Sequence, residues 1–237
     1  MKAFTLSEVL ITIGIIGLVA AMTMPGVIKN YQRKETETRL QRAYSIINQA
    51  FMAAQVKHGE IKDWPEWDDA EFILENYIKP EIKEAKFFPS SESSTNLMCF
   101  EGDFVGNYTL GSSNASTQYG WMDNVHISNP FYKNITSSIK LMDGTCIGLN
   151  SNQTEYSRFS QMIFIDTNGS YRRPNKAGID LFFFIVDKNR IMPYGYDKSL
   201  TEISDKSTYS ACHLQARFGG LYCAAKIMAE GWKINYW

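Results

Sequence analysis

The apolar residues at the N-terminal end of the chain form one continuous run. From Phe4 to Met24 most residues are apolar, and Glu8 is the single charged residue among them. As a helix this segment would extend about 32 Å, enough to cross the hydrocarbon core of a bilayer. A carboxylate at membrane depth costs roughly 2.5–3.5 kcal/mol on insertion scales, so Glu8 favours a positively charged partner from another molecule.

After Pro25 the apolar residues follow helical spacing instead. One apolar stripe recurs every three or four residues, while the opposite face is polar; the stripe consists of Leu40, Tyr44, Ile47, Phe51 and Ala54. Lys57, His58 and Gly59 are typical of a helix C-terminus. The pattern predicts one helix from about Phe4 to His58, bent at Pro25, with a membrane-spanning first half and an amphipathic second half.

Short elements are expected beyond the long helix. The pattern predicts a second helix over residues 68–78 and a hairpin over 139–149 that turns at Asp143-Gly144. Further strands are expected at 97–100, 104–110, 161–166, 181–186 and 191–194. Helical spacing returns over 208–230, with a break at Gly219-Gly220. A long helix followed by antiparallel strands and a C-terminal helical segment indicates the α+β class.

The first 30 residues resemble the type IV prepilin leader that type IV pilins and type II secretion pseudopilins share. The resemblance depends on the relative spacing of Phe4, Glu8, Gly17 and Pro25. Ala3 stands where the family usually has Gly, and the leader is very short. The resemblance implies a pilin-like fold, with a leader at 1–3, a transmembrane helix at 4–24, its amphipathic continuation at 25–58 and an exported globular domain at 59–237.

The same resemblance implies how the chain would act. A prepilin peptidase/methyltransferase would cut after Ala3 and methylate the new amino terminus at Phe4. Glu8 would pair with that amine on a neighbouring subunit, while Gly14, Gly17 and Pro25 would allow close helix contact or local flexibility.

The chain would be a non-catalytic fibre subunit of a type II secretion pseudopilus or a type IV pilus. Its partners would be other pilin or pseudopilin subunits, membrane lipid and an assembly platform in the bacterial inner membrane. It would cross that membrane once, with the globular domain on the periplasmic or extracellular side, and lie in the fibre after assembly.

Two other interpretations of the apolar run remain open. An ordinary signal peptide cleaved near Ala21 would release an exported soluble binding module or enzyme, although Glu8 is unusual inside such a segment. A plain signal anchor has the same length. Loop charges do not decide the orientation, because Lys2 lies on one side and Lys29, Arg33 and Lys34 lie on the other.

Four cysteines follow the apolar run, and in an exported domain they are expected to form disulfides. Cys212 and Cys223 would lie about 16 Å apart on one continuous helix, which is too far for a bond. A bend at Gly219-Gly220 would bring them together and leave Cys99 to pair with Cys146. Four cysteines allow three pairings, and this one is favoured over the others.

Residues 166–180 join two predicted strands and offer a weak calcium candidate. Asp166, Asn168 and Asp180 supply oxygen ligands, and the first two are spaced as at the start of a calcium loop. Position 177, where that pattern needs a glutamate, is alanine. Asp and Asn also stabilise turns through their own backbone, so a structural turn is the favoured interpretation. Otherwise no cofactor or metal is expected.

The composition of the chain argues against some functions but indicates no particular chemistry. The chain has 237 residues, a formal net charge of −1, 44% hydrophobic residues and 21% charged residues. Such a balance gives no indication of nucleic-acid binding. Its three histidines are scattered, and no nucleotide-binding, nucleophile or metalloprotease motif occurs. The sequence therefore offers no footing for an enzyme, and a structural role is what the resemblance implies.

Overall fold

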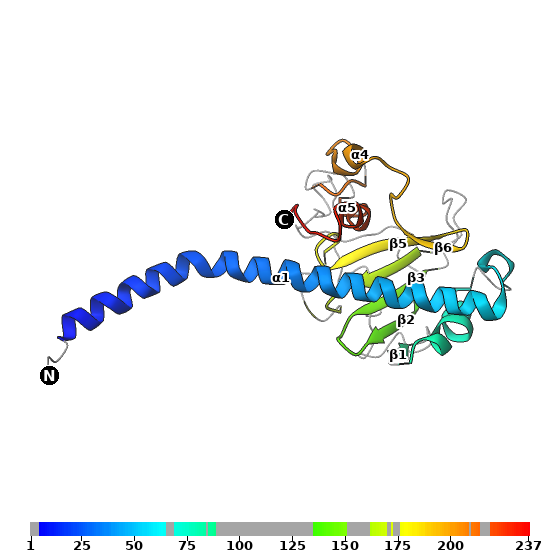
Figure 1. The fold of residues 1–237 in the computed structure, drawn as a ribbon, viewed down its shortest axis with the longest axis horizontal. Helices are drawn as coiled ribbons and strands as arrows, with labels where there is room; N and C mark the ends of the chain where they lie inside the picture. The colour runs from blue at the N-terminus through cyan, green and yellow to red at the C-terminus, as the bar shows by residue number, and fades with distance from the viewer. Residues whose placement is uncertain are drawn as a thin grey trace, which may run out of the picture. The chain divides into compact units, whose positions relative to one another are not determined.

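The protein contains a long N-terminal helix and a six-stranded antiparallel sheet, an α+β arrangement (Figure 1). The computed structural model describes residues 5–64, 69–83, 85–88, 135–150, 162–169, 172, 176–208, 210–213 and 219–237. Spatial contacts divide the chain into two compact units, Met1–Glu35 and Thr36–Trp237. The predicted boundaries after residues 24 and 58 remain predictions.

Helix α1 runs from Leu6 to His58, in agreement with the predicted long helix. Pro25 lies inside it and does not end it. Because proline has no N–H, the carbonyl of Ala21 lacks its usual helical partner at this point. The helix ends where the sequence predicts: Gly59 adopts a φ of 84°, and its N–H donates to the Gln55 carbonyl at 2.9 Å.

Within the second unit, α1 buries one face. The fully buried positions recur at helical spacing, as the apolar stripe predicts, and Tyr44 is half-buried at its edge. These buried positions are Leu40, Ala43, Ile47, Ala50, Phe51 and Ala54. One acidic residue, Glu37, also lies on the buried side. The sequence pattern gave no sign of this burial.

Short helical turns follow α1. They are η1 (Ile61–Asp63), α2 (Ala70–Ile73), the π-helical η2 (Leu74–Ile78) and η3 (Lys79–Glu81). Asp69 caps α2 by accepting hydrogen bonds from the N–H groups of Glu71 and Phe72. The helix predicted over 68–78 is therefore present from residue 70, but its second half widens into a π-helix.

The sheet is an antiparallel meander whose strands pair in chain order. Its strands are β1 (Ala85–Phe88), β2 (Ile135–Leu141), β3 (Cys146–Asn150), β4 (Met162–Asp166), β5 (Leu181–Asp187) and β6 (Arg190–Pro193). The β2–β3 hairpin turns at Asp143-Gly144, where Gly144 adopts a φ of 89°, so that prediction is confirmed. The strands predicted at 97–100 and 104–110 lie outside the described residues.

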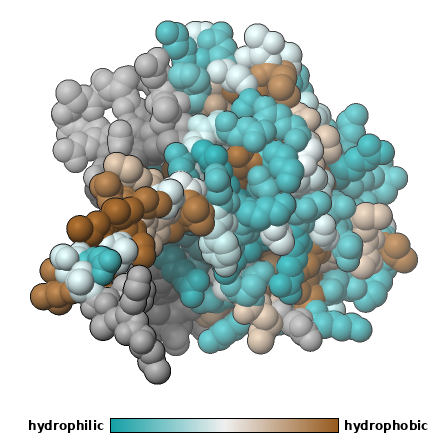
Figure 2. Space-filling view, turned by 60° about the vertical axis from the view of Figure 1, so that its left-hand side comes forward, coloured by the Kyte–Doolittle hydropathy of each residue, from teal (hydrophilic) through white to brown (hydrophobic). Residues whose placement is uncertain are grey.

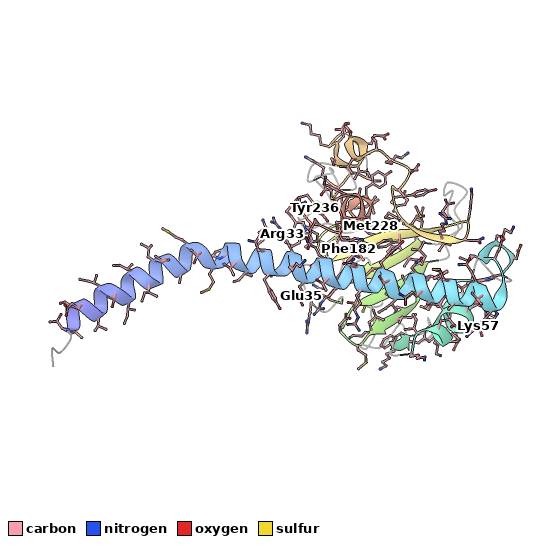
Figure 3. The ribbon with its side chains drawn as sticks, viewed as in Figure 1. Arg33, Glu35, Lys57, Phe182, Met228 and Tyr236 are labelled. Atoms are coloured by element: carbon pink, nitrogen blue, oxygen red, sulfur yellow. A yellow bond between two sulfur atoms is a disulfide. The ribbon has the colours of Figure 1, made fainter. Side chains whose placement is uncertain are left out.

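Strand β5, next to the edge strand β6, is buried on both faces. Phe182, Phe184 and Val186 point into the core that α1 covers, as expected from the two-residue period of a strand. Phe183 faces the other way and meets Phe164 edge-on, with ring centroids 5.5 Å apart. Figure 3 shows Phe182 on β5, with Met228 on α5. The sheet therefore needs cover on both sides, and α1 supplies it on one.

Two short helices follow the sheet, α4 (Leu200–Ser204) and α5 (Cys223–Ala229). The prediction of helical structure over 208–230 is only partly right, because α5 is its one helix among the described residues and 210–213 form turns. Here Cys212 N–H donates to the Ile203 carbonyl at 2.7 Å, and Gly220 N–H to that of Ala211 at 2.9 Å. These bonds hold the chain in a loop, so it cannot continue as a helix.

The C-terminal tail is tied to the rest of the second unit. The N–H of Ile234 donates to Glu37 Oε1 at 2.9 Å, which gives the buried carboxylate a partner. Tyr236 donates to the Gly178 carbonyl at 2.6 Å. Burial raises the pKa of Tyr236 well above its ordinary value. Both ends of the second unit's sequence therefore meet at one buried polar contact.

Candidate functional site

The candidate site is the apolar part of α1. The large hydrophobic residues from Leu6 to Ile28 are exposed, by fractions from 42% at Val9 to 79% at Leu6. Figure 2 shows apolar side chains gathered along this part of the chain. The helix is long and apolar enough to cross a membrane. A helix from the core of a soluble protein would instead bury such residues.

Glu8 lies near the start of this helix and is bonded to Thr5. The Thr5 N–H and hydroxyl donate to Glu8 Oε2 at 2.8 and 2.7 Å, and the Glu8 N–H donates to Thr5 Oγ1 at 3.3 Å. This reciprocal arrangement is a capping box, with Thr5 as the N-cap. Sequence reasoning missed it, although Thr5-Leu6-Ser7-Glu8 is the standard pattern for such a cap.

The capping box explains how a carboxylate can sit in an apolar segment of a single chain. Two donors from Thr5 replace part of the hydration that Glu8 would lose in lipid. Both bonds end on Oε2, and no described residue donates to Oε1. A donor from another molecule can therefore reach Glu8 without displacing Thr5. Ala3 and Phe4, the predicted cleavage and methylation residues, lie outside the described residues.

We expect Thr5→Val to loosen the first turn of α1, whereas Thr5→Ser leaves it intact. Valine keeps the shape but removes the hydroxyl that accepts from and donates to Glu8, and loss of an N-cap costs about 1 kcal/mol. Hydrogen exchange of the full chain in detergent micelles measures this directly. Amides of the first turn should exchange about fivefold faster in the valine variant. Equal exchange in both variants would show that the cap contributes nothing.

The two glycines that the sequence analysis named in the apolar part of α1 do not pack closely against other described residues. A Cβ on Gly14 or Gly17 would meet no described atom within 4 Å. Neither glycine is required by packing within this part of the chain. Their predicted role in close helix contact therefore concerns partners and remains a prediction, as does the predicted flexibility at Pro25.

The predicted pairing of the last two cysteines is confirmed. Cys212 and Cys223 form a disulfide with α-carbons 4.7 Å apart. Gly220 adopts a φ of 97° between them, so the expected bend at Gly219-Gly220 lets the bond close. Cys146 is also disulfide-bonded. Its predicted partner, Cys99, lies outside the described residues.

We expect the double substitution Cys212→Ser with Cys223→Ser to destabilise the globular part by about 2–4 kcal/mol, since the bond closes a short loop that holds α5. Urea denaturation of the full chain in detergent, followed by tryptophan fluorescence, gives the free energy of unfolding. An unchanged midpoint would mean that the hydrogen bonds of the loop suffice without the disulfide.

The weak calcium candidate forms a compact polar turn. Asp166 Oδ1 accepts from the N–H groups of Asn168 and Gly169 at 3.0 and 2.8 Å. Asp180 accepts from the Lys176 N–H at 2.6 Å and from the Asn168 amide at 3.2 Å. These hydrogen bonds are those of a structural turn, which is the interpretation that the sequence favoured. In the part of the chain that the structure describes, no cluster of three acidic, His or Cys side chains is placed to hold a metal. Calcium binding remains a prediction.

A groove of about 720 Å³ runs between α1 and the edge strand β6. Its walls include Met52, Val56 and Met192. Helix side chains occupy the strand edge, since the Tyr44 hydroxyl donates to the Ile191 carbonyl at 3.1 Å and the Gln55 amide to that of Asn189 at 3.3 Å. These contacts and Pro193, which has no N–H, protect the edge against added strands.

Comparison with known proteins gives one partial match. A family model described as a family of unknown function (DUF6613) matches residues 26–99. That segment is less than half of the chain and begins beyond Glu8. No curated protein and no solved structure matches the chain.

Proposed function

We propose that the chain is a prepilin-like structural subunit, processed after Ala3, N-methylated at Phe4 and assembled into a helical fibre. The fibre would be a type II secretion pseudopilus or a type IV pilus. Before assembly the subunit would reside in the inner membrane, anchored by α1, with residues 59–237 on the periplasmic or extracellular side. The proposal assigns it no catalytic activity.

The observation that carries this proposal is Glu8 in an exposed, otherwise uncharged apolar helix. Exposed apolar residues over more than 20 positions need lipid or protein around them. Thr5 offsets only part of the cost of a carboxylate among them, so a cation from another molecule would stabilise Glu8 further. The spacing of Phe4, Glu8, Gly17 and Pro25 adds support, because it resembles the prepilin pattern.

The assembly step would use the second oxygen of Glu8. Thr5 holds Oε2, and the methylated amine of Phe4 from a neighbouring subunit would donate to Oε1. A charge-assisted bond between N⁺–H and a carboxylate is about twice as strong as a neutral one. One such pair per subunit would fix the axial register of the helices in the fibre core, as single buried polar contacts do in coiled coils.

Shearing and fractionation of native host cells tests the fibre. The proposal predicts the chain in two pools, one in the membrane fraction and one in high-molecular-mass fibres that pellet after shearing. Cross-linking before lysis should give a ladder of multimers from both cell-surface and membrane material. A chain recovered only as soluble monomer in the exported fraction would contradict the proposal and favour an ordinary exported protein.

A further inference from the structure

The charges at the far end of the apolar helix suggest a further contact. Leu6 to Ile28 extends about 33 Å along α1, close to the thickness of the hydrocarbon core. Lys29 follows at once, and Arg33 and Lys34 come within the next two turns. At about 1.5 Å per residue, these three cations lie about 2–9 Å beyond the apolar segment. That is the depth of the phospholipid headgroups, which add roughly 5–8 Å on each side of the core.

The local arrangement favours a negatively charged surface there. Lys29 and Arg33 are four residues apart and share one face of α1. Glu35, the only acid among residues 29–35, is two residues beyond Arg33 and so lies about 200° round the helix; Figure 3 shows the two on opposite sides. Tyr31 lies among the cations and is 69% exposed. A tyrosine at this depth is typical of the membrane interface, where its ring meets apolar chains and its hydroxyl meets water.

We propose that Lys29, Arg33 and Lys34 bind the phosphate-bearing headgroups of anionic phospholipids where α1 leaves the bilayer. This depends on the proposed membrane span, but not on fibre assembly or on processing after Ala3. The three cations outnumber the two acids of residues 29–37, Glu35 and Glu37, so attraction does not require that each side chain lack other contacts. Binding would hold the subunit at a fixed depth before it moves into a fibre.

Native mass spectrometry of the full chain in detergent micelles tests the preference. Phosphatidylglycerol and phosphatidylcholine with identical acyl chains would be added in turn. Each cation near an anionic surface contributes about fivefold in affinity at low salt. The wild-type chain should therefore bind phosphatidylglycerol at least about tenfold more tightly, and the combined substitution Lys29→Gln, Arg33→Gln and Lys34→Gln should remove that preference.

A matched control separates this site from general charge. Lys62, Lys83 and Lys206 are exposed lysines of the second unit. Replacing all three with glutamine removes the same charge and should leave the preference unchanged. Three results would each contradict the site. The wild-type chain could show no preference for phosphatidylglycerol, the first variant could keep the full preference, or the control variant could lose as much preference as the first variant.

Alkaline carbonate extraction of host membranes distinguishes failure of the site from failure of the membrane span. The wild-type chain and the first variant should both stay in the membrane, because the apolar segment is unchanged. If both stay and no lipid preference exists, the headgroup site is wrong and the span stands. If the wild-type chain is released, the span is wrong and the headgroup site falls with it.

Discussion

Replacing Glu8 with glutamine is expected to block fibre incorporation while leaving cleavage after Ala3 intact. Glutamine has the same shape and still accepts from Thr5, so the first turn of α1 should persist. It lacks the negative charge that would pair with the Phe4 amine of a neighbouring subunit. Removing one partner of a buried ion pair costs about 3–5 kcal/mol, because the other charge is left unpaired. Incorporation should therefore fall by well over tenfold, measured as the share of chain in sheared fibres.

Glu35→Gln is the matched control for this experiment. It removes one negative charge from the same helix but outside the apolar segment. Its incorporation should stay near that of the wild type, and its amount in the membrane should match that of the Glu8 variant. If the Glu8 variant enters fibres normally, Glu8 does not pair subunits.

Replacing Phe184 with alanine is expected to cause the largest loss of stability in the globular part. Phe184 is fully buried on β5 and stacks on Tyr44 of α1, with ring centroids 5.3 Å apart. It therefore joins the sheet to the helix that covers it. Truncating a buried phenylalanine costs about 3–5 kcal/mol through lost transfer energy and the cavity left behind. Urea denaturation of the full chain in detergent should show a lower midpoint with a similar slope.

Phe87→Ala gives the comparison at a less buried site. Phe87 lies on the edge strand β1 and is only partly buried, so the same truncation should cost less than half as much. Equal losses in the two variants would mean that the Phe184–Tyr44 contact does not dominate the packing of α1 on the sheet.

The sequence predicted the long helix and its buried face because both depend on local spacing. The stripe through Leu40 and Phe51 has a helical period, and Gly59 marks the helix end. Asp143-Gly144 likewise predicted the β2–β3 turn, since a tight hairpin needs a residue at positive φ. Each of these features depends on residues that are close together in the chain, so it can be predicted from a single sequence.

Contacts outside helical spacing determined what periodicity alone did not predict. Helical spacing over 208–230 favoured a helix, yet the Cys212–Cys223 bond and the loop bonds to Ala211 and Ile203 limit α5 to Cys223–Ala229. Burial of Glu37 depends on the N–H of Ile234, 197 residues further along the chain. Local periodicity cannot reveal either contact.

Two capping boxes were missed for a different reason. Thr5–Glu8 starts α1, and Ser199–Glu202 starts α4, which the sequence reasoning did not predict at all. Both match the Ser/Thr-x-x-Glu pattern of a helix start. The signal was present, but Glu8 was interpreted only as a partner for another subunit, and a helix as short as α4 has too few turns to show a period.

Mass spectrometry of the N-terminal peptide, taken from membrane-associated chain of the native host, tests the central claim most directly. The prepilin account predicts a chain that begins at Phe4 with one methyl group on its amine. A chain that begins near Met22 would contradict it, because the apolar helix with Glu8 would then be a discarded signal peptide. An unprocessed Met1 in a host with active prepilin peptidase would contradict it as well and leave a plain membrane anchor.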